Sequence, residues 1–197
     1  MAKETSDKSR AAFAEAEARI QRALEGEAKS LDLNGLGLSK LPEALAQLTQ
    51  LQKLDLSDNQ LTSVARPLNR LLRLQKLYLN GNRLTCVPKS FSRLIRLQEL
   101  YLDDNRLKSI PESLDQLTQL QTLSLSSNQL TSVPESLGRL TQLQVLLLHY
   151  NQFTLVPPAI GQLSALRELH LQNNRLTSIP ETFGELTQLR ELYLYSN

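Results

Sequence analysis

Few residues of this chain could do chemistry. It contains one cysteine, Cys86, and two histidines, His149 and His170, which Glu168 or Glu191 could join around a metal ion. A nucleophilic thiol needs a paired base, and the sequence places none near Cys86. Metal ligands need an outer set of hydrogen bonds to orient them, and the flat, exposed positions predicted for the histidines lack one. The sequence therefore predicts no catalytic residue, no metal site and no cofactor.

The elements that carry these residues recur every 23 residues, for example from Leu74 to Leu97. The pattern is L-x-x-L-x-L-x-x-N-x-L-x-x-[LVI]-P-x-x-[LFI]-x-x-L, and LQELYLDDNRLKSIPESLDQL at residues 97–117 shows it in full. A constant interval of this length indicates repeats that stack on their neighbours. Repeats one to eight begin, in order, at Ala28, Leu51, Leu74, Leu97, Leu120, Leu143, Leu166 and Leu189.

Each repeat predicts one short strand, a turn and a return. In the L-x-L segment successive side chains point to opposite faces, so the leucines point inward and the residue between them points outward. The asparagine at position nine is predicted to be buried and to bond the backbone of its own and the adjacent repeat. The proline at position fifteen removes a backbone donor, which favours a 3₁₀ or extended back face.

These motifs resemble the leucine-rich repeat family over residues 28–197, as seven full repeats and an eighth that stops after its strand. Their length and proline position are similar to Ras-group and Roco-type repeats, and LDLNGLGLSKLP at residues 31–42 resembles the start of a Roco array. The resemblance implies an α/β right-handed solenoid, or horseshoe, with a parallel β-sheet on the concave face and a 3₁₀ or extended convex face. The G-x-x-x-x-G-K-[ST] loop of a Roco GTPase is absent.

The two ends differ from the repeats. Residues 1–27 are predicted to form a disordered start, over residues 1–8, and an N-terminal capping helix, over residues 10–25, which stops at Gly26; residues 28–197 form the repeat domain. At the other end, either the natural chain continues past Asn197 or the last strand pairs with a second copy in a homodimer. The predicted oligomer edge comprises Leu189, Leu192, Tyr193, Leu194 and Tyr195.

Composition argues against several classes of partner. The chain has 22 Lys and Arg against 20 Asp and Glu, without a basic or acidic block, so we expect no nucleic acid and no membrane partner. The first residues show neither a signal peptide nor a myristoylation site. With a single cysteine, this favours a cytoplasmic protein, although a secreted bacterial effector fits as well.

The residues that vary at the outward positions three, five, seven and eight are the candidates for function. All five tyrosines and both histidines lie at these positions, whereas the phenylalanines lie elsewhere. Tyrosine is favoured at interfaces, although β-propensity alone would also place it on a sheet. The predicted partner-binding residues are Tyr78, Tyr101, Val145, Leu147, His149, Tyr150, His170, Tyr193 and Tyr195.

The sequence thus predicts a non-enzymatic scaffold that binds a protein or peptide through the concave face of repeats five to eight. The alternative is the recognition arm of a larger enzyme, such as a Roco-type GTPase or an effector ubiquitin ligase, whose catalytic domain is missing from this chain. The histidines also suggest an association that depends on pH.

Overall fold

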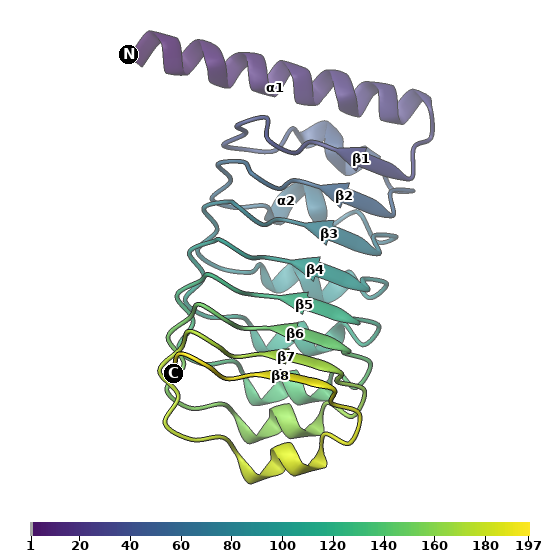
Figure 1. Ribbon diagram of the computed structural model, residues 1–197. Helices are drawn as coiled ribbons and strands as arrows, with labels where there is room; N and C mark the ends of the chain where they lie inside the picture. Colours follow the sequence, from purple (N-terminus) through teal and green to yellow (C-terminus); the bar gives the residue numbers. More distant parts are fainter. Residues whose placement is uncertain (1) are drawn as a thin grey trace.

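The fold is one open, eight-stranded parallel sheet in which every strand pairs with its neighbours in chain order. The computed structural model describes residues 2–197, and Figure 1 shows the strands stacked from β1 to β8 along one side of the solenoid. The predicted fold class is confirmed. The strands are β1 (Ser30–Asp32), β2 (Lys53–Asp55), β3 (Lys76–Tyr78), β4 (Glu99–Tyr101), β5 (Thr122–Ser124), β6 (Val145–Leu147), β7 (Glu168–His170) and β8 (Glu191–Tyr193).

The register places the same repeat position side by side in every strand. Leu100 of β4 pairs with Leu77 on one side and with Leu123 on the other, and all three are fully buried. The leucines therefore form continuous inward columns, and residues that differ between repeats are displayed in columns on the concave face.

The convex face consists of short turns of 3₁₀ helix, as the prolines predict. Each begins after a proline, and five of the six prolines, such as Pro111 with φ −74°, are in extended conformation. Repeat two has Ala65 in place of this proline and forms the four-residue α-helix α2 (Ala65–Leu68) instead. The 3₁₀ helices are η1 (Glu43–Gln47), η2 (Lys89–Arg93), η3 (Glu112–Gln116), η4 (Glu135–Arg139), η5 (Pro158–Gln162) and η6 (Glu181–Glu185).

Neighbouring convex turns approach closely where glycine occupies position nineteen. A Cβ added to Gly138 would lie 2.6 Å from the carbonyl oxygen of Ala159, and one added to Gly161 would lie 2.4 Å from that of Thr182. Real Cβ atoms do not approach a backbone oxygen so closely, so only glycine permits this spacing between η4, η5 and η6.

A ladder of buried asparagines ties each turn to the next. The Oδ1 atom of Asn128 accepts the amide of Leu107 at 2.9 Å, and its Nδ2 donates to the carbonyls of Leu102, Leu125 and Ser126 at 2.9, 3.1 and 3.0 Å. One amide side chain thereby satisfies backbone groups of two adjacent repeats, which would otherwise be buried without partners. The same bonds recur at Asn59, Asn82, Asn105, Asn151 and Asn174.

Helix α1 (Ala2–Glu25) packs across the β1 end of the stack (Figure 1). Ala16, Ile20 and Ala23 are buried there, which agrees with the expected capping role. The helix begins eight residues before the predicted start, and residues 2–8, predicted to be disordered, are helical; the first residue lies outside the described part.

Burial decreases in the last repeats of the described chain. Ile179, the apolar residue before the proline of repeat seven, is 47% exposed, because no further coil covers it in the structure. Leu192 of β8 is 38% exposed, whereas the corresponding Leu169 of β7 is fully buried. Cys86 is exposed, although its place beside the inward Val87 favours partial burial.

Candidate binding surface

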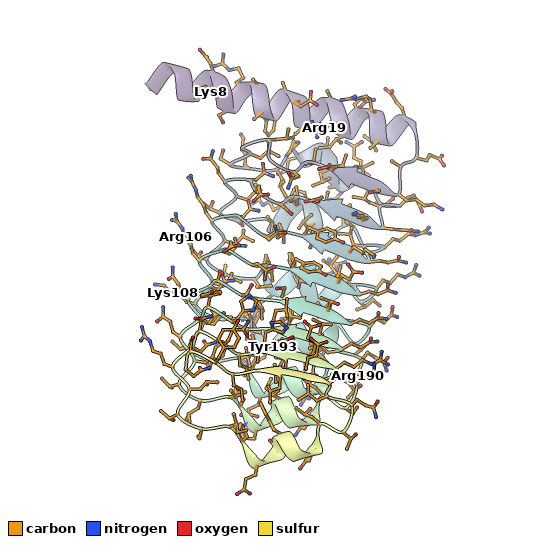
Figure 2. The ribbon with its side chains drawn as sticks, viewed as in Figure 1. Lys8, Arg19, Arg106, Lys108, Arg190 and Tyr193 are labelled. Atoms are coloured by element: carbon orange, nitrogen blue, oxygen red, sulfur yellow. The ribbon has the colours of Figure 1, made fainter. Side chains whose placement is uncertain are left out.

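The concave face carries one central column of side chains from position five. Along this column the strand register aligns Tyr78 with Tyr101, and Leu147 with His170 and Tyr193. Figure 2 shows Tyr193 in the middle of the sheet side of the solenoid, between arginines at its two edges. The column is aromatic or apolar over most of repeats three to eight, which suits contact with another macromolecule.

The tyrosines of repeats three and four form a stack in which the hydroxyl of Tyr78 already has a hydrogen-bond partner. The rings of Tyr78 and Tyr101 lie 5.1 Å apart at an interplanar angle of 13°. The hydroxyl of Tyr78 donates to Glu99 at 3.1 Å, and Lys76 pairs with the same carboxylate at 2.6 Å. Burial and the negative charge of Glu99 raise the pKa of Tyr78 to about 12, so the phenol stays protonated. We call Tyr78 and Tyr101 the tyrosine stack.

Repeat five interrupts the column. Ser124 is fully buried and Ser126 is 6% exposed, although both occupy positions predicted to point outward to solvent. Their hydroxyls and the amide of Ser126 donate to the carboxylate of Asp103. These small side chains lie between the larger ones of repeats four and six, which shield them from water.

The larger cluster lies in repeats six to eight. His149 contacts Tyr150 edge to face and His170 at a tilt, in both cases with ring centroids 5.6 Å apart, and the rings of His170 and Tyr193 are 4.3 Å apart. Tyr150 and Tyr195 are 57% and 61% exposed. We call this surface the C-terminal patch; it comprises Val145, Leu147, His149, Tyr150, His170, Tyr193 and Tyr195.

Polar residues that the sequence did not single out for binding complete the patch. The Nε2 atom of His170 lies 2.6 Å from Glu168 Oε1, and its Nδ1 lies 3.3 Å from Gln172 Nε2. The hydroxyl of Tyr193 donates to Glu191 at 2.9 Å. The close spacing of Glu168, His170 and Gln172 on one face of a strand could have been predicted from alternation, but not their hydrogen bonds.

Two buried side-chain atoms, one in the C-terminal patch and one beside it, have no hydrogen-bond partner among the described residues. They are Nδ1 of His149 and Oε1 of Gln172, which occupy position seven of adjacent repeats. A buried polar atom without a partner destabilises a protein by about 1–3 kcal/mol. Such atoms are uncommon in folded proteins, so these two are candidates for hydrogen bonds to a partner.

Tyr150 occupies a strained backbone position. Position eight is left-handed in all eight repeats, with φ between 50° and 67°, and glycine, aspartate, asparagine or serine occupies the other seven. Tyr150 has φ 54°, although the left-handed conformation costs an ordinary residue roughly 1–2 kcal/mol. Strain of this kind is concentrated at functional sites, which makes the exposed ring of Tyr150 a strong candidate for contact with a partner.

Burial and the neighbouring imidazole of His170 lower the pKa of His149, while the carboxylates of Asp103 and Asp104 act in the opposite direction. Below its ordinary pKa of 6.5, His149 is therefore protonated less readily in the folded protein than in the unfolded chain. Stability consequently rises with pH in this range, because the unfolded state binds more protons.

We therefore expect the melting temperature to fall as the pH is lowered below the ordinary histidine pKa of 6.5, because the unfolded chain takes up a proton at His149 more readily than the folded protein does. Replacing His149 by glutamine removes this titration, so the fall should be smaller in the variant. Thermal melts of both proteins over a pH series measure the difference. An identical pH profile for the two proteins would contradict the assignment.

Among residues 2–197, no group of three or more histidine, cysteine, aspartate or glutamate side chains is arranged to hold a metal ion. None of the described helices combines the length and apolarity that crossing a membrane requires.

Comparison with known proteins identifies the family. Residues 85–197 match a family model described as a leucine-rich repeat region, and residues 17–136 match one described as a leucine-rich repeat. A search of curated proteins finds no significant match.

Solved structures share the fold. A leucine-rich repeat protein of Leptospira interrogans is 35% identical, with a TM-score of 0.77, over 90% of this chain and 52% of its own. The ectodomain of the Arabidopsis thaliana receptor kinase GASSHO1/SCHENGEN3, in complex with CASPARIAN STRIP INTEGRITY FACTOR 2, is 38% identical over 79% of this chain and 19% of its own, with a TM-score of 0.72. Internalin C2 of Listeria monocytogenes is 27% identical over 94% of this chain and 85% of its own, with a TM-score of 0.79.

The chain thus spans about half the length of the Leptospira protein and a fifth of the receptor ectodomain. The asparagine ladder, the parallel sheet and both family models all indicate leucine-rich repeats. The chain belongs to the leucine-rich repeat family.

Proposed function

We propose that this protein is a non-enzymatic scaffold that binds a protein or peptide through the concave face of repeats five to eight. The observation that carries the proposal is the C-terminal patch, in which the exposed Tyr150, Tyr193 and Tyr195 gather beside Leu147 on one face. Aromatic side chains of this kind dominate the energy of protein interfaces. The similar receptor ectodomain is described in complex with another factor, which supports binding as the general role.

The choice of repeats five to eight over repeats three and four depends on unsatisfied groups. The tyrosine stack has partners for Tyr78, Lys76 and Glu99 within the chain. In contrast, the C-terminal patch contains one orphaned polar atom, with a second beside it, and a strained tyrosine. A partner that satisfies those groups gains free energy that the tyrosine stack cannot supply, so Tyr78 and Tyr101 are assigned to the margin of the contact.

A second candidate function is the recognition arm of a larger protein, including an enzyme of the Roco or ubiquitin ligase type. It is favoured because this chain covers only part of the length of two similar proteins. The Leptospira protein is about twice as long as the region matched, with 52% of its length covered. In that case the concave face would also bind a protein, and a separate domain would act on that target.

The proposed compartment is the cytoplasm, where the exposed thiol of Cys86 stays reduced.

Hydroxyl-radical footprinting of a captured complex tests the binding face. A partner isolated on the immobilised chain and identified by mass spectrometry is mixed with the free chain, and side-chain oxidation is compared with and without it. We expect protection of Tyr150, Tyr193 and Tyr195, with no change at the exposed Leu72 and Ile95, which lie at position twenty-two. Protection at Leu72 and Ile95 together with unchanged tyrosines would reject the concave face.

We also propose that the free edge of β8 pairs with a second copy of the chain. In the described structure β8 is bonded to β7 only, and Leu192, Tyr193 and Tyr195 are exposed there, beside the half-buried Leu189 and Leu194. An unpaired edge with apolar side chains favours association. Light scattering at micromolar concentration and at neutral and mildly acidic pH is expected to give twice the mass of the 22.2 kDa chain. A strictly monomeric mass under both conditions contradicts the proposal.

A further inference from the structure

The C-terminal patch is surrounded by carboxylates that have no lysine or arginine partner. Asp103, Asp104, Glu168 and Glu191 all lie at outward concave positions of repeats four to eight. Among the described residues, their ionic and hydrogen-bonding partners are serine, tyrosine and histidine side chains. The concave face therefore concentrates negative charge on a chain whose net charge is +2.

The arginines of the same repeats lie away from this surface. Figure 2 shows Arg106 and Arg190 at opposite edges of the solenoid, with Tyr193 between them. Arg175 shares the repeat position of Arg106, and Arg167 that of Arg190. None of these arginines forms an ion pair with Glu168 or Glu191 among the described residues.

Glu168 and Glu191 are direct register neighbours on β7 and β8. Adjacent strands lie about 4.8 Å apart, so the two carboxylates repel each other across the sheet. The equivalent position of β3 and β4 holds Lys76 against Glu99, which attract each other at 2.6 Å. At this register position β7 and β8 therefore lack the countercharge that β3 contributes opposite β4.

Gln172 provides an independent observation that points to a hydrogen-bond donor. Its side chain is only 6% exposed, yet its Oε1 accepts no hydrogen bond. Its Nε2 is hydrogen-bonded to His170, and His170 to Glu168, so the orphaned oxygen ends a polar chain that begins at the uncompensated carboxylate. Gln172 Oε1 at one end and the Glu168 carboxylate at the other are both acceptors, and an N–H group of a partner could donate to either.

We propose that the patch recognises a protein segment in which a lysine or arginine stands next to an apolar side chain. The apolar side chain packs on Leu147 and Tyr193, and the cationic head lies between Glu168 and Glu191. This inference rests on the proposed function and adds the chemistry of the partner to it: charge complementarity selects the segment, and aromatic contact holds it.

Selection from a random linear peptide library displayed on phage tests this. Wild-type chain is compared with the Glu168→Gln/Glu191→Gln variant and with the matched control Glu112→Gln/Glu181→Gln, whose carboxylates are exposed on the convex face. We expect wild type and control to enrich peptides with lysine or arginine beside an apolar residue. A selected peptide should bind the Glu168→Gln/Glu191→Gln variant about tenfold more weakly, with equal binding by wild type and control.

The outcomes separate the two proposals. The enriched peptides could be apolar without a basic residue and lose binding when Leu147 is replaced by serine. That result overturns the charge inference and leaves the proposed function intact. Peptides that bind wild type and Leu147→Ser equally, or a selection without any sequence preference, overturn both. Equal melting temperatures of the compared proteins confirm that a loss of binding is not a loss of fold.

Discussion

Replacing Asn128 by leucine will destabilise the protein by about 4 kcal/mol or more, because the carbonyls and the amide that the side chain bonds are left buried without partners. This is a large part of the 5–15 kcal/mol that a typical domain has available. Because each repeat is stabilised mainly by its neighbours, the loss in repeat five also weakens the contacts on both sides of it. Equilibrium unfolding in urea, followed by circular dichroism, measures the change.

Asn197 offers a matched control for this prediction. It makes the same bonds, to the amide of Leu176 and to the carbonyls of Leu171 and Leu194, but it is exposed to water. Water can replace the lost bonds there, so Asn197→Leu should cost only a fraction of the free energy that Asn128→Leu costs. If both substitutions have the same small effect, the ladder is not a main source of stability.

The simultaneous replacement of Leu147, Tyr150 and Tyr193 by alanine is expected to raise the dissociation constant for the partner by at least about 100-fold, since each large side chain at the centre of an interface contributes on the order of 1–2 kcal/mol or more. All three side chains are at least partly exposed, so the melting temperature should change little. Isothermal titration and thermal melts of the same samples measure both quantities.

The single substitution Tyr150→Asn separates strain from packing. Asparagine accepts the left-handed φ of 54° more readily, so the variant should be more stable by about 1 kcal/mol and yet bind more weakly.

The control for both binding predictions is Leu72→Ala/Ile95→Ala, which removes exposed apolar side chains at position twenty-two. Unchanged affinity of the triple variant, or weakened affinity of the control, would show that the contact lies elsewhere.

The sequence was sufficient for the repeat register, because every inward column is made of identical or similar residues at a constant interval. It was sufficient for the asparagine ladder for the same reason. It did not predict that α1 extends to Ala2, since residues 2–9 lack an apolar stripe that would indicate a helix. It also did not predict the burial of Ser124, which depends on the size of the side chains in the two adjacent repeats.

For the candidate site, alternation within each strand placed the tyrosines and histidines on one face, but it did not reveal which of their polar atoms have partners. The orphaned oxygen of Gln172 results from the orientation of the His170 ring, which is a tertiary property. The strain at Tyr150 was in principle visible, because the other repeats have glycine, aspartate, asparagine or serine at that position. A bulky residue in such a column is a signal that periodicity analysis can find.

The glycines that bring η4, η5 and η6 together have a consequence for the shape of the face opposite them. A solenoid bends when its outer side is spaced more widely than its inner side, and here Gly138 and Gly161 bring the outer turns closer together. Any residue with a Cβ at Gly161 would push η5 and η6 apart, which would widen the outer spacing and tighten the curve of the concave face on the opposite side.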